Sequence, residues 1–519
     1  MHEVVGQDNR EPAGDIPRLG LLMLLAAIFA AAACAIIYEL LIGAVSSYFL
    51  GDSVEQFSLT IGCFLFAMGL GSWISRFIQD QLLERFVGLE IALGLVGGLT
   101  VPALYLAFAY TEQFRFVQIA VIIITGGLIG LELPLLTRIV RGCGSLRTIL
   151  ANVLSLDYFG SLVAALIFPY LLLPFLGAFH TSLVTGLLNA LIGLVLLVVV
   201  RALVQPATGI ALGVSGVIII AILGLLLLKA DVLQERWEAS LYAETIVHSE
   251  QTRYQKVVLT QWDDEVRLYL DGHLQFSSVD EYRYHESLVQ PVMALTRSRE
   301  RVLVIGGGDG LAVREVLKHP DVLAVDLVDI DPAVTRLARR NLRLTSINKN
   351  ALNYPKVRIF NEDAFVFLQR SHVPYGVIIL DLPDPRFEAL AKLYSVEGYR
   401  LCRRHLAPGG VVATQATSPY YARRTYWTIA ASLEAAGFKV IPYHAYVPSF
   451  GEWGFHLASS QTIDPASMGD FPVSTKFFEE SLFEQMLHFP DDMGRIAVDA
   501  NRIDRPHIAR HYREDWSAW

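Results

Sequence analysis

An aspartate stands inside a glycine turn in the sequence VLVIGGGDGLAVREV, residues 302–316. Four apolar residues run into three glycines, Asp309 and Gly310 follow, and the spacing after them is helical. A glycine turn between a strand and a helix is where a doubly wound α/β domain binds a nucleotide. Pyrophosphate would be repelled by Asp309, whereas a sulfonium or ammonium ion would be attracted. The turn therefore predicts a cationic ligand that carries a nucleoside.

Further polar residues stand where the next strands are predicted to end. They are Asp329 and Asp331 after the second strand, Asp363 after the third, Asp381 and Asp384 after the fourth, and Gln415 after the fifth. Strands that alternate with helices indicate a parallel sheet, whose ligands bind beyond the carboxyl ends of its strands. Asp329 follows the glycine turn by about 20 residues, the spacing of an acid that binds ribose hydroxyls. These acids predict an adenosyl pocket.

The chain before this sheet consists of a long apolar part and a shorter amphipathic part. Seven apolar runs are long enough to cross a bilayer, since a spanning helix needs about 20 residues. They are, approximately, 19–45, 57–75, 87–110, 114–137, 151–176, 181–204 and 209–228. After Lys229 the chain becomes amphipathic, and residues 256–277 alternate around a WDDE turn, which predicts a β-hairpin.

These patterns predict a polytopic α-helical membrane bundle of about seven spans. The bundle is fused to an α/β, Rossmann-like (methyltransferase-like) domain with a parallel sheet and a small N-terminal β-hairpin subdomain. The expected divisions are an N-terminal tail, 1–18; the transmembrane domain, 19–229; the β-hairpin subdomain, 230–295; the Rossmann-like domain, 296–465; and a C-terminal helical tail, 466–519.

Composition excludes several function classes. The 519 residues are 53% hydrophobic, which is too apolar for a soluble protein, and the net charge of −9 argues against a nucleic-acid partner. The four cysteines lie far apart without a CxxC or Cys/His spacing, so neither a disulfide framework nor a metal site is indicated. The first apolar run is too long for a cleavable signal peptide.

Acids also stand inside the apolar runs. Glu39, Glu132 and Asp157 are deep in their runs, where ionisable groups are costly and functional by default. Glu90 lies near the start of a run, and we expect it at the membrane interface or paired with an arginine. We expect the other three to line a site for a polyamine cation, with backbone carbonyls opened by Pro134 and Pro169, through which the bundle takes up, releases or senses substrate or product.

The soluble half resembles the spermidine synthases, a family of polyamine aminopropyltransferases. The resemblance covers roughly residues 250–460 and rests on YQ (254–255), LYLDGHLQFSSVDEYRYHE (268–286), VIGGGDGLAVREVLKHP (304–320), VDIDP (328–332), EDA (362–364) and DLPDP (381–385). The pieces YELL, GLELPLLTR and LDYFG in the apolar half, and VPSFGEWGF at 447–455, are similar to the membrane-attached branch of that family.

The resemblance implies that decarboxylated S-adenosylmethionine, a co-substrate rather than a cofactor, gives its aminopropyl group to putrescine, which yields spermidine and methylthioadenosine. Asp381 would be the catalytic acid–base residue. Donor-binding residues would be Gln255, Tyr284, His285, Gly306, Gly308, Asp309, Gly310, Asp329, Asp363 and Ala364, and acceptor-binding residues Asp384, Gln275, Gln415 and Phe450. No metal is needed for this reaction.

Three departures from the family pattern concern the acceptor. Leu382 and Pro383 stand where soluble members usually have two serines, and Phe450 aligns with a tyrosine that contacts the acceptor. Asp329 is often glutamate in the family, but the shorter acid should still reach ribose. The residues expected to bind the donor thus match the family pattern, whereas those expected to bind the acceptor depart from it, so the sequence specifies the acceptor less closely than the donor.

Two other functions stay open. One is an S-adenosylmethionine-dependent methyltransferase, which the acid in the glycine turn and the paired aspartates of DLPDP oppose. The other is a polyamine transporter or sensor with a binding-only domain, which the bundle acids suit but an intact Asp381 does not need.

The predicted location is the cell membrane, as a multi-pass protein, and the predicted assembly is a homodimer. Arginines lie in the N-terminal tail (Arg10, Arg18) and in the second, fourth and sixth loops, among them Arg76, Arg138 and Arg141. The positive-inside rule then places the N-terminus in the cytoplasm, and seven spans place the catalytic domain outside. Decarboxylated S-adenosylmethionine is not expected outside the cell, so we nevertheless expect the catalytic domain in the cytoplasm.

Overall fold

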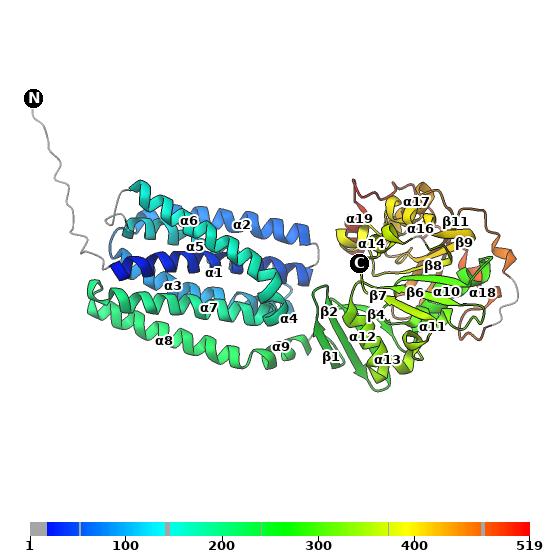
Figure 1. Ribbon diagram of the computed structural model, residues 1–519, viewed down its shortest axis with the longest axis horizontal. Helices are drawn as coiled ribbons and strands as arrows, with labels where there is room; N and C mark the ends of the chain where they lie inside the picture. Colours follow the sequence, from blue (N-terminus) through cyan, green and yellow to red (C-terminus); the bar gives the residue numbers. More distant parts are fainter. Residues whose placement is uncertain (1–17, 51–52, 141–145, 240, 372, 469–472) are drawn as a thin grey trace, which may run out of the picture. The chain divides into compact units, whose positions relative to one another are not determined.

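The computed structural model describes residues 18–50, 53–140, 146–239, 241–371, 373–468 and 473–519. Most of the predicted N-terminal tail, Arg10 and Arg141 thus lie outside the described residues. The chain forms two compact units, one that ends at Ala243 and one that begins at Glu244 (Figure 1).

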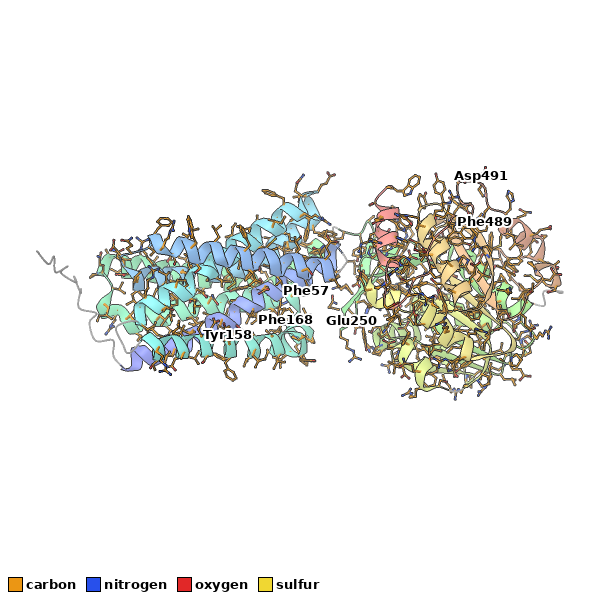
Figure 2. The ribbon with its side chains drawn as sticks, turned by 90° about the horizontal axis from the view of Figure 1, so that it is seen from above. Phe57, Tyr158, Phe168, Glu250, Phe489 and Asp491 are labelled. Atoms are coloured by element: carbon orange, nitrogen blue, oxygen red, sulfur yellow. The ribbon has the colours of Figure 1, made fainter. Side chains whose placement is uncertain are left out.

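The first unit is a bundle of long apolar helices. Its helices are α1 (Arg18–Leu50), α2 (Ser53–Ile74), α3 (Leu82–Gly98), α4 (Thr100–Tyr110), α5 (Phe114–Val140), α6 (Leu146–Ile167), α7 (Leu173–Val200), α8 (Pro206–Leu228) and α9 (Ala230–Ala239). Six helical segments of the described chain are long and apolar enough to cross a membrane. Apolar side chains also cover the outside of the bundle, where Tyr158 is 69% exposed (Figure 2). This surface confirms a multi-pass membrane bundle.

One of the six segments, Leu150–Leu203, contains 54 residues. A helix of that length would extend about 80 Å, whereas the hydrocarbon core is about 30 Å thick. Gly177 breaks the segment with φ 71° and ψ 171°. After the break, Phe179 packs on Tyr105 at the end of α4, and Gln205, just past α7, donates its N–H to Glu84 in the first turn of α3. Helix α7 therefore runs back along α3 and α4, and counting α6 and α7 separately gives the predicted seven crossings.

Close helix contacts explain the glycines of the apolar runs. A Cβ on Gly71 in α2 would lie 2.0 Å from the carbonyl oxygen of Gly127 in α5, and one on Gly130 would lie 2.1 Å from that of Met68. Small residues let membrane helices approach each other in this way. These glycines pack the two helices and carry no chemistry.

The second unit contains two sheets. Strands β1 (Thr245–Gln251), β2 (Lys256–Trp262), β3 (Glu265–Leu270) and β4 (His273–Ser277) form an antiparallel sheet in sequence order. Its central β2–β3 pair is the predicted hairpin, and the turn residue Asp263 has φ 48°. The small subdomain is thus a sheet of four strands rather than a single hairpin.

The larger sheet has seven strands in the order β10-β11-β9-β8-β5-β6-β7. The five predicted parallel strands are β5 (Arg301–Gly306), β6 (Ala324–Val328), β7 (Val357–Phe360), β8 (Tyr375–Asp381) and β9 (Leu406–Gln415). Strands β10 (Lys439–Val447) and β11 (Gly451–Ser459) extend it antiparallel at the β9 edge.

Helices cover both faces of this sheet because its strands are apolar on both faces. Along β5, Val302 and Val304 enter one core and Leu303 and Ile305 the other. The first core contains α10 (Glu281–Leu295), α11 (Leu311–Val316) and α12 (Pro332–Arg340), and the second contains α14 (Ala364–Arg370), α16 (Val396–Arg404) and α17 (Arg423–Ala435). The α/β prediction is confirmed.

The boundary between the units lies after Ala243 and not at 229/230 as predicted. The reason is α9, whose charged sequence looks soluble but which packs in the first unit. Its Trp237 ring lies 5.4 Å from that of Phe179, and Asp231 pairs with His180 at 3.2 Å. The finer divisions at 295/296 and 465/466 stay predictions. The last part of the chain holds α18 (Glu480–Met486) and α19 (Ile508–Trp516).

Candidate active site

The predicted acids meet at the carboxyl ends of β5, β6 and β8. In the parallel register Gly306 stands beside Asp381. A Cβ on Gly306 would lie 2.1 Å from the carbonyl oxygen of Asp381, and the residue has φ 77°. Glycine at this position therefore lets the turn after β5 lie directly against the end of β8.

Three N–H groups of the glycine turn are bonded within the protein and do not face a ligand. The Gly308 N–H donates to Asp329 at 3.1 Å, the Gly310 N–H to the Gly307 carbonyl at 2.9 Å, and the Leu311 N–H to the Asp309 carboxylate at 2.8 Å. These N–H groups would otherwise face an anion. Their partners are protein acceptors, so among these groups the Asp309 carboxylate is the charged one in the turn.

Asp309 itself is held by the backbone. In addition to the Leu311 N–H on its carboxylate, its carbonyl accepts from Asn348 Nδ2 at 2.8 Å. Burial raises the pKa of Asp309 to about 6, with the charge of His285 acting in the opposite direction and that of Asp381 in the same one. At neutral pH the side chain is mostly a carboxylate in an interior that favours a cation beside it.

Asp329 directly follows β6 and also accepts from the Asp331 N–H at 2.8 Å. Burial raises the pKa of Asp329 to about 7, although the hydrogen bond from the Asp331 N–H lowers it. The predicted donor residue Gln255 does not reach Asp309; its Nε2 donates to Asp331 at 3.2 Å. Gln255 therefore belongs to the side of the site where the ribose is expected.

Asp381 is bracketed by two side chains of α10. The Tyr284 hydroxyl donates to one carboxylate oxygen at 2.8 Å, and His285 Nε2 lies 4.0 Å from the other. Burial raises the pKa of Asp381, against the opposing effects of the His285 charge and the Tyr284 hydrogen bond. A buried carboxylate with a raised pKa beside a cation has the properties of a general base.

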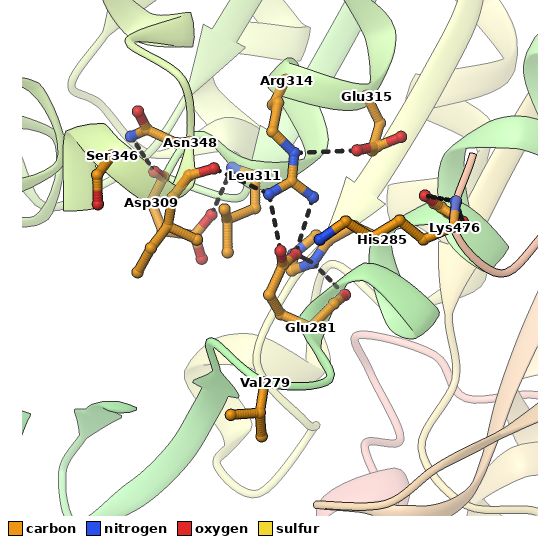
Figure 3. A network of polar contacts seen from close by, with 12 residues as sticks. Val279, Glu281, His285, Asp309, Leu311, Arg314, Glu315, Ser346, Asn348 and Lys476 are labelled. Atoms are coloured by element: carbon orange, nitrogen blue, oxygen red, sulfur yellow. Dashed lines mark hydrogen bonds and ion pairs between the residues drawn. The ribbon is translucent and has the colours of Figure 1, made fainter. Parts of the chain in front are cut away.

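A charge network around His285 fixes its protonation state (Figure 3). Glu281 accepts from His285 Nδ1 at 2.9 Å and from the Arg314 guanidinium at 2.7 and 2.9 Å, and Arg314 Nε donates to Glu315 at 2.9 Å. Burial alone would lower the pKa of His285, but the hydrogen bond and charge of Glu281, with the charges of Asp381 and Asp309, raise it to about 9. His285 is thus an imidazolium at neutral pH.

The same network holds Glu281 ionised. Burial opposes its charge, but hydrogen bonds from His285 and Arg314 lower the pKa of Glu281 to about 2. The sequence analysis missed Glu281 and Arg314. The Glu281–His285 pair is visible as a spacing of four residues on a predicted helix, whereas Arg314 reaches the pair from another helix.

Within the described ranges, one group of three His, Cys, Asp or Glu side chains is close enough to hold a metal ion. It consists of His285, Asp309 and Asp381, whose ligand atoms lie within 4.8 Å of one another. An imidazolium has no lone pair for a metal, because both its nitrogens are protonated. At neutral pH the group therefore suits an organic cation between the two carboxylates better than a metal.

Asp384, after β8, accepts hydrogen bonds from a different set of side chains. Its carboxylate accepts from the Tyr512 hydroxyl at 2.8 Å, and the predicted residue Gln415 lies 3.4 Å away. Gln415 Nε2 also donates to the Leu382 carbonyl at 2.8 Å. Burial raises the pKa of Asp384, while Arg386 and these hydrogen bonds act against it. Tyr512, 5% exposed, comes from α19, and the sequence analysis missed it.

The remaining predicted residues lie at different distances from this cluster. Asp363 caps α14 by accepting the Phe365 N–H at 2.8 Å and pairs with Lys392, and Ala364 is the first residue of that helix. The Phe450 ring lies 6.2 Å from that of Tyr284, so it borders the Asp381 side. Gln275 on β4 donates to the His273 carbonyl at 3.0 Å, and the structure does not join it to the acids.

Comparison with known proteins identifies the family to which this chain is similar. The "Spermine/spermidine synthase domain" family matches residues 281–467. Polyamine aminopropyltransferase 2 of Ralstonia nicotianae is 43% identical over 506 residues, which cover 96% of this chain and 98% of the relative. The polyamine aminopropyltransferase of Leptospira interrogans is 41% identical over 93% of this chain and 96% of its own length. A solved spermidine synthase from Thermotoga maritima, 26% identical, covers 48% of this chain and 85% of that chain with a TM-score of 0.42.

The similarity to the curated relatives extends through the bundle, since it includes nearly the whole of both chains. It accounts for a site rich in acids, because aminopropyl transfer uses cationic substrates. The chain belongs to the polyamine aminopropyltransferase family and is an enzyme of that class.

Proposed function

We propose that the enzyme transfers the aminopropyl group of decarboxylated S-adenosylmethionine to putrescine, which gives spermidine and methylthioadenosine. The observation that carries this proposal is Asp309, a half-buried carboxylate in a glycine turn in which the N–H groups of Gly308, Gly310 and Leu311 are bonded to protein acceptors. It would hold the ammonium of the donor and repel the carboxylate of ordinary S-adenosylmethionine, which discriminates between the two.

The reaction is a displacement at the carbon attached to the sulfonium. The acceptor amine forms the new C–N bond, the C–S bond breaks, and its electron pair returns to sulfur as methylthioadenosine leaves. An alkylamine is protonated at neutral pH because its pKa is about 10. Asp381 would take that proton, and the Tyr284 hydroxyl on its other oxygen would fix the direction of the carboxylate.

Other residues would position the substrates. Asp329 would accept hydrogen bonds from the ribose hydroxyls, and Asp363 with Ala364 would contact the adenine edge. Asp384 would anchor the distal ammonium of the acceptor, so that the near nitrogen meets the reacting carbon in line. Tyr512 orients Asp384 from the side opposite Gln415.

The acceptor proposal is broader than putrescine alone. Leu382, Pro383 and Phe450 replace hydroxyl-bearing residues of soluble relatives, and Leu382 is 8% exposed. An acceptor site with fewer hydroxyl groups has fewer hydrogen-bonding positions, so it distinguishes diamines of different length less strictly. We therefore expect putrescine to be used, with tolerance for longer diamines such as cadaverine.

The location of the catalytic unit and the assembly are also proposals. We place the unit in the cytoplasm because its donor is made there, although seven crossings and the loop arginines favour the opposite side. A phosphatase or a fluorescent reporter fused after Trp519 distinguishes the two sides. We further propose a homodimer, which light scattering of the purified protein in detergent tests.

The experiment is an assay of purified protein with either donor and a diamine panel, with products identified by mass. We expect spermidine from putrescine and the decarboxylated donor. Asp381→Asn should retain donor binding and lower kcat by about 100-fold or more, because an amide cannot accept the proton. Asp309→Asn should instead weaken donor binding and narrow the preference over S-adenosylmethionine.

The outcomes separate the competing functions. Methylated product from S-adenosylmethionine would make the protein a methyltransferase, and binding without turnover would make it a transporter or sensor. Near-normal turnover in Asp381→Asn would remove that residue from its role, and an unchanged donor preference in Asp309→Asn would do the same for Asp309.

A further inference from the structure

A cavity of about 110 Å³ lies inside the helical bundle, among α1, α2, α3, α5 and α6. Glu39 of α1, Glu132 of α5 and Asp157 of α6 all line it, so three of the acids that stand alone in the sequence meet at one place. Water occupies about 30 Å³ per molecule, so the cavity has room for a group of several heavy atoms.

Glu132 is without a partner at this cavity. Its side chain is 9% exposed, and its Oε1 atom has no hydrogen bond. An unpaired carboxyl in an apolar interior is costly, more so beside other acids. A bound ligand that supplies the missing hydrogen-bond and charge partner would explain why such a carboxyl is present in a membrane bundle.

No cation of the described chain supplies the missing partner. The nearest basic residue in α5, Arg138, donates to the carbonyls of Ser75 and Ile78 at 2.8 and 2.7 Å. Within the residues that the structure describes, no lysine or arginine forms an ion pair with Glu39, Glu132 or Asp157. The buried Glu90 accepts from the Asn189 amide at 3.5 Å, and among the described residues no arginine forms an ion pair with it, so it is neither at the interface nor paired as expected.

The spacing of the three acids argues against a metal ion. In the described residues, the one group whose ligand atoms come within 4.8 Å of one another is that of His285, Asp309 and Asp381 in the second unit. The bundle acids are therefore too far apart for one small ion. They come from three helices and are separated by apolar lining such as Ile28, Ile36 and Leu136. Separate carboxylates with apolar wall between them suit ammonium groups joined by methylenes.

We propose that this cavity is a second binding site for an alkyl polyammonium cation, distinct from the catalytic site. Glu132 binds an ammonium group in the interior, Glu39 and Asp157 bind the adjoining ones, and the methylene segments lie against the apolar wall. The Ser161 hydroxyl, one turn after Asp157, also lines the cavity and can accept from an ammonium. Only the choice of polyamines as probes rests on the proposed function.

The test is equilibrium dialysis of the full-length protein in detergent with labelled spermidine. An Asp309→Asn/Asp384→Asn background removes binding at the catalytic site. We expect one equivalent of spermidine to remain bound in this background. Glu132→Gln or Glu39→Gln, added to it, should weaken that binding at least tenfold. The matched control is Glu112→Gln, an exposed acid between α4 and α5.

A second measurement uses the unsubstituted protein, in case a variant fails to fold. A hydrophobic carbodiimide should label Glu132, and spermidine should slow the labelling, read by mass spectrometry, more than sodium chloride of equal ionic strength. No bound spermidine in the background, or equal protection by sodium, would overturn the proposal. Both outcomes are independent of the transfer assay, which tests the catalytic site separately.

Discussion

His285 is a buried cation between carboxylates, and its charge affects the protonation of the proposed base. Glu281 and Arg314 hold the imidazolium in place from behind. Removing the cation while retaining a hydrogen-bonding side chain would test what its charge does for Asp381. The sign follows from the pKa of Asp381, which burial raises and the His285 charge lowers.

We predict that His285→Gln moves the acid limb of the kcat/KM profile to higher pH. Asp381 must be ionised to accept a proton, so activity rises as pH passes through its pKa. Loss of the neighbouring cation raises that pKa, and the limb should move by about one pH unit or more. The pH profile of the purified variant measures this. His488→Gln, an exposed control, should leave the limb unchanged, and an unmoved limb in His285→Gln would refute the role of the charge.

The sequence predicts acids at strand ends better than it predicts what holds them. Asp329 and Asp381 stand at the ends of apolar runs and Asp309 follows one after three glycines, so parallel pairing brings them together. Arg314 and Tyr512 could not be found in this way. Arg314 looks like an ordinary exposed helix residue, and Tyr512 is 128 positions after the aspartate it contacts.

Helix α19 brings the Tyr512 side chain to Asp384, on the proposed acceptor side of the site. This short helix packs on α17, where Asp515 accepts the Thr425 N–H at 3.1 Å and pairs with Arg424 at 2.8 Å. Those contacts set the position from which Tyr512 reaches Asp384. The family match ends at residue 467, so the contribution of α19 lies beyond the matched domain.

We predict that Tyr512→Phe raises the KM for the diamine by about tenfold or more, with kcat and the KM for the donor much less affected. The change removes only the hydroxyl that orients Asp384, and a hydrogen bond to a charged group contributes about 1.5–3 kcal/mol. Steady-state kinetics with both substrates varied measures the effect. Tyr446→Phe, at a 54% exposed position, is the control. Equal loss of donor and acceptor affinity would indicate a purely structural tyrosine.

Elements with a clear pattern of apolar and polar residues were predicted correctly, and elements with a mixed pattern were not. The hairpin at 256–270 has two β-rich segments around a turn, of which β3 alternates between buried and half-buried residues, and β5 to β9 are largely apolar runs followed by polar residues. Helix α9 is charged yet packs in the bundle through Trp237, because one aromatic residue can attach an otherwise polar helix. Strand β1 was missed because its residues are half-buried with no regular alternation.

The whole molecule has separate cores in its two units. The buried residues of the bundle form one cluster, and those around the large sheet form two others, with no residue shared among them. A unit with its own core can fold alone. We predict that residues 244–519, expressed by themselves, are soluble and transfer aminopropyl groups with a kcat comparable to that of the whole chain. Size-exclusion chromatography and the transfer assay test this, and aggregation or inactivity would show that the units need each other.

The titration of Asp329 has a calorimetric consequence. With a pKa of about 7, this carboxyl carries about half a proton at neutral pH in the free enzyme. In the proposed donor site, ribose hydroxyls would donate to it, favour its ionised form and expel that proton. Binding of methylthioadenosine, which is uncharged, should therefore release about half a proton at pH 7. Titrations in buffers with different ionisation enthalpies would show this as a slope, and the slope should vanish in Asp329→Asn. The nucleoside would then bind more tightly as the solution becomes more alkaline, although it has no charge of its own to titrate.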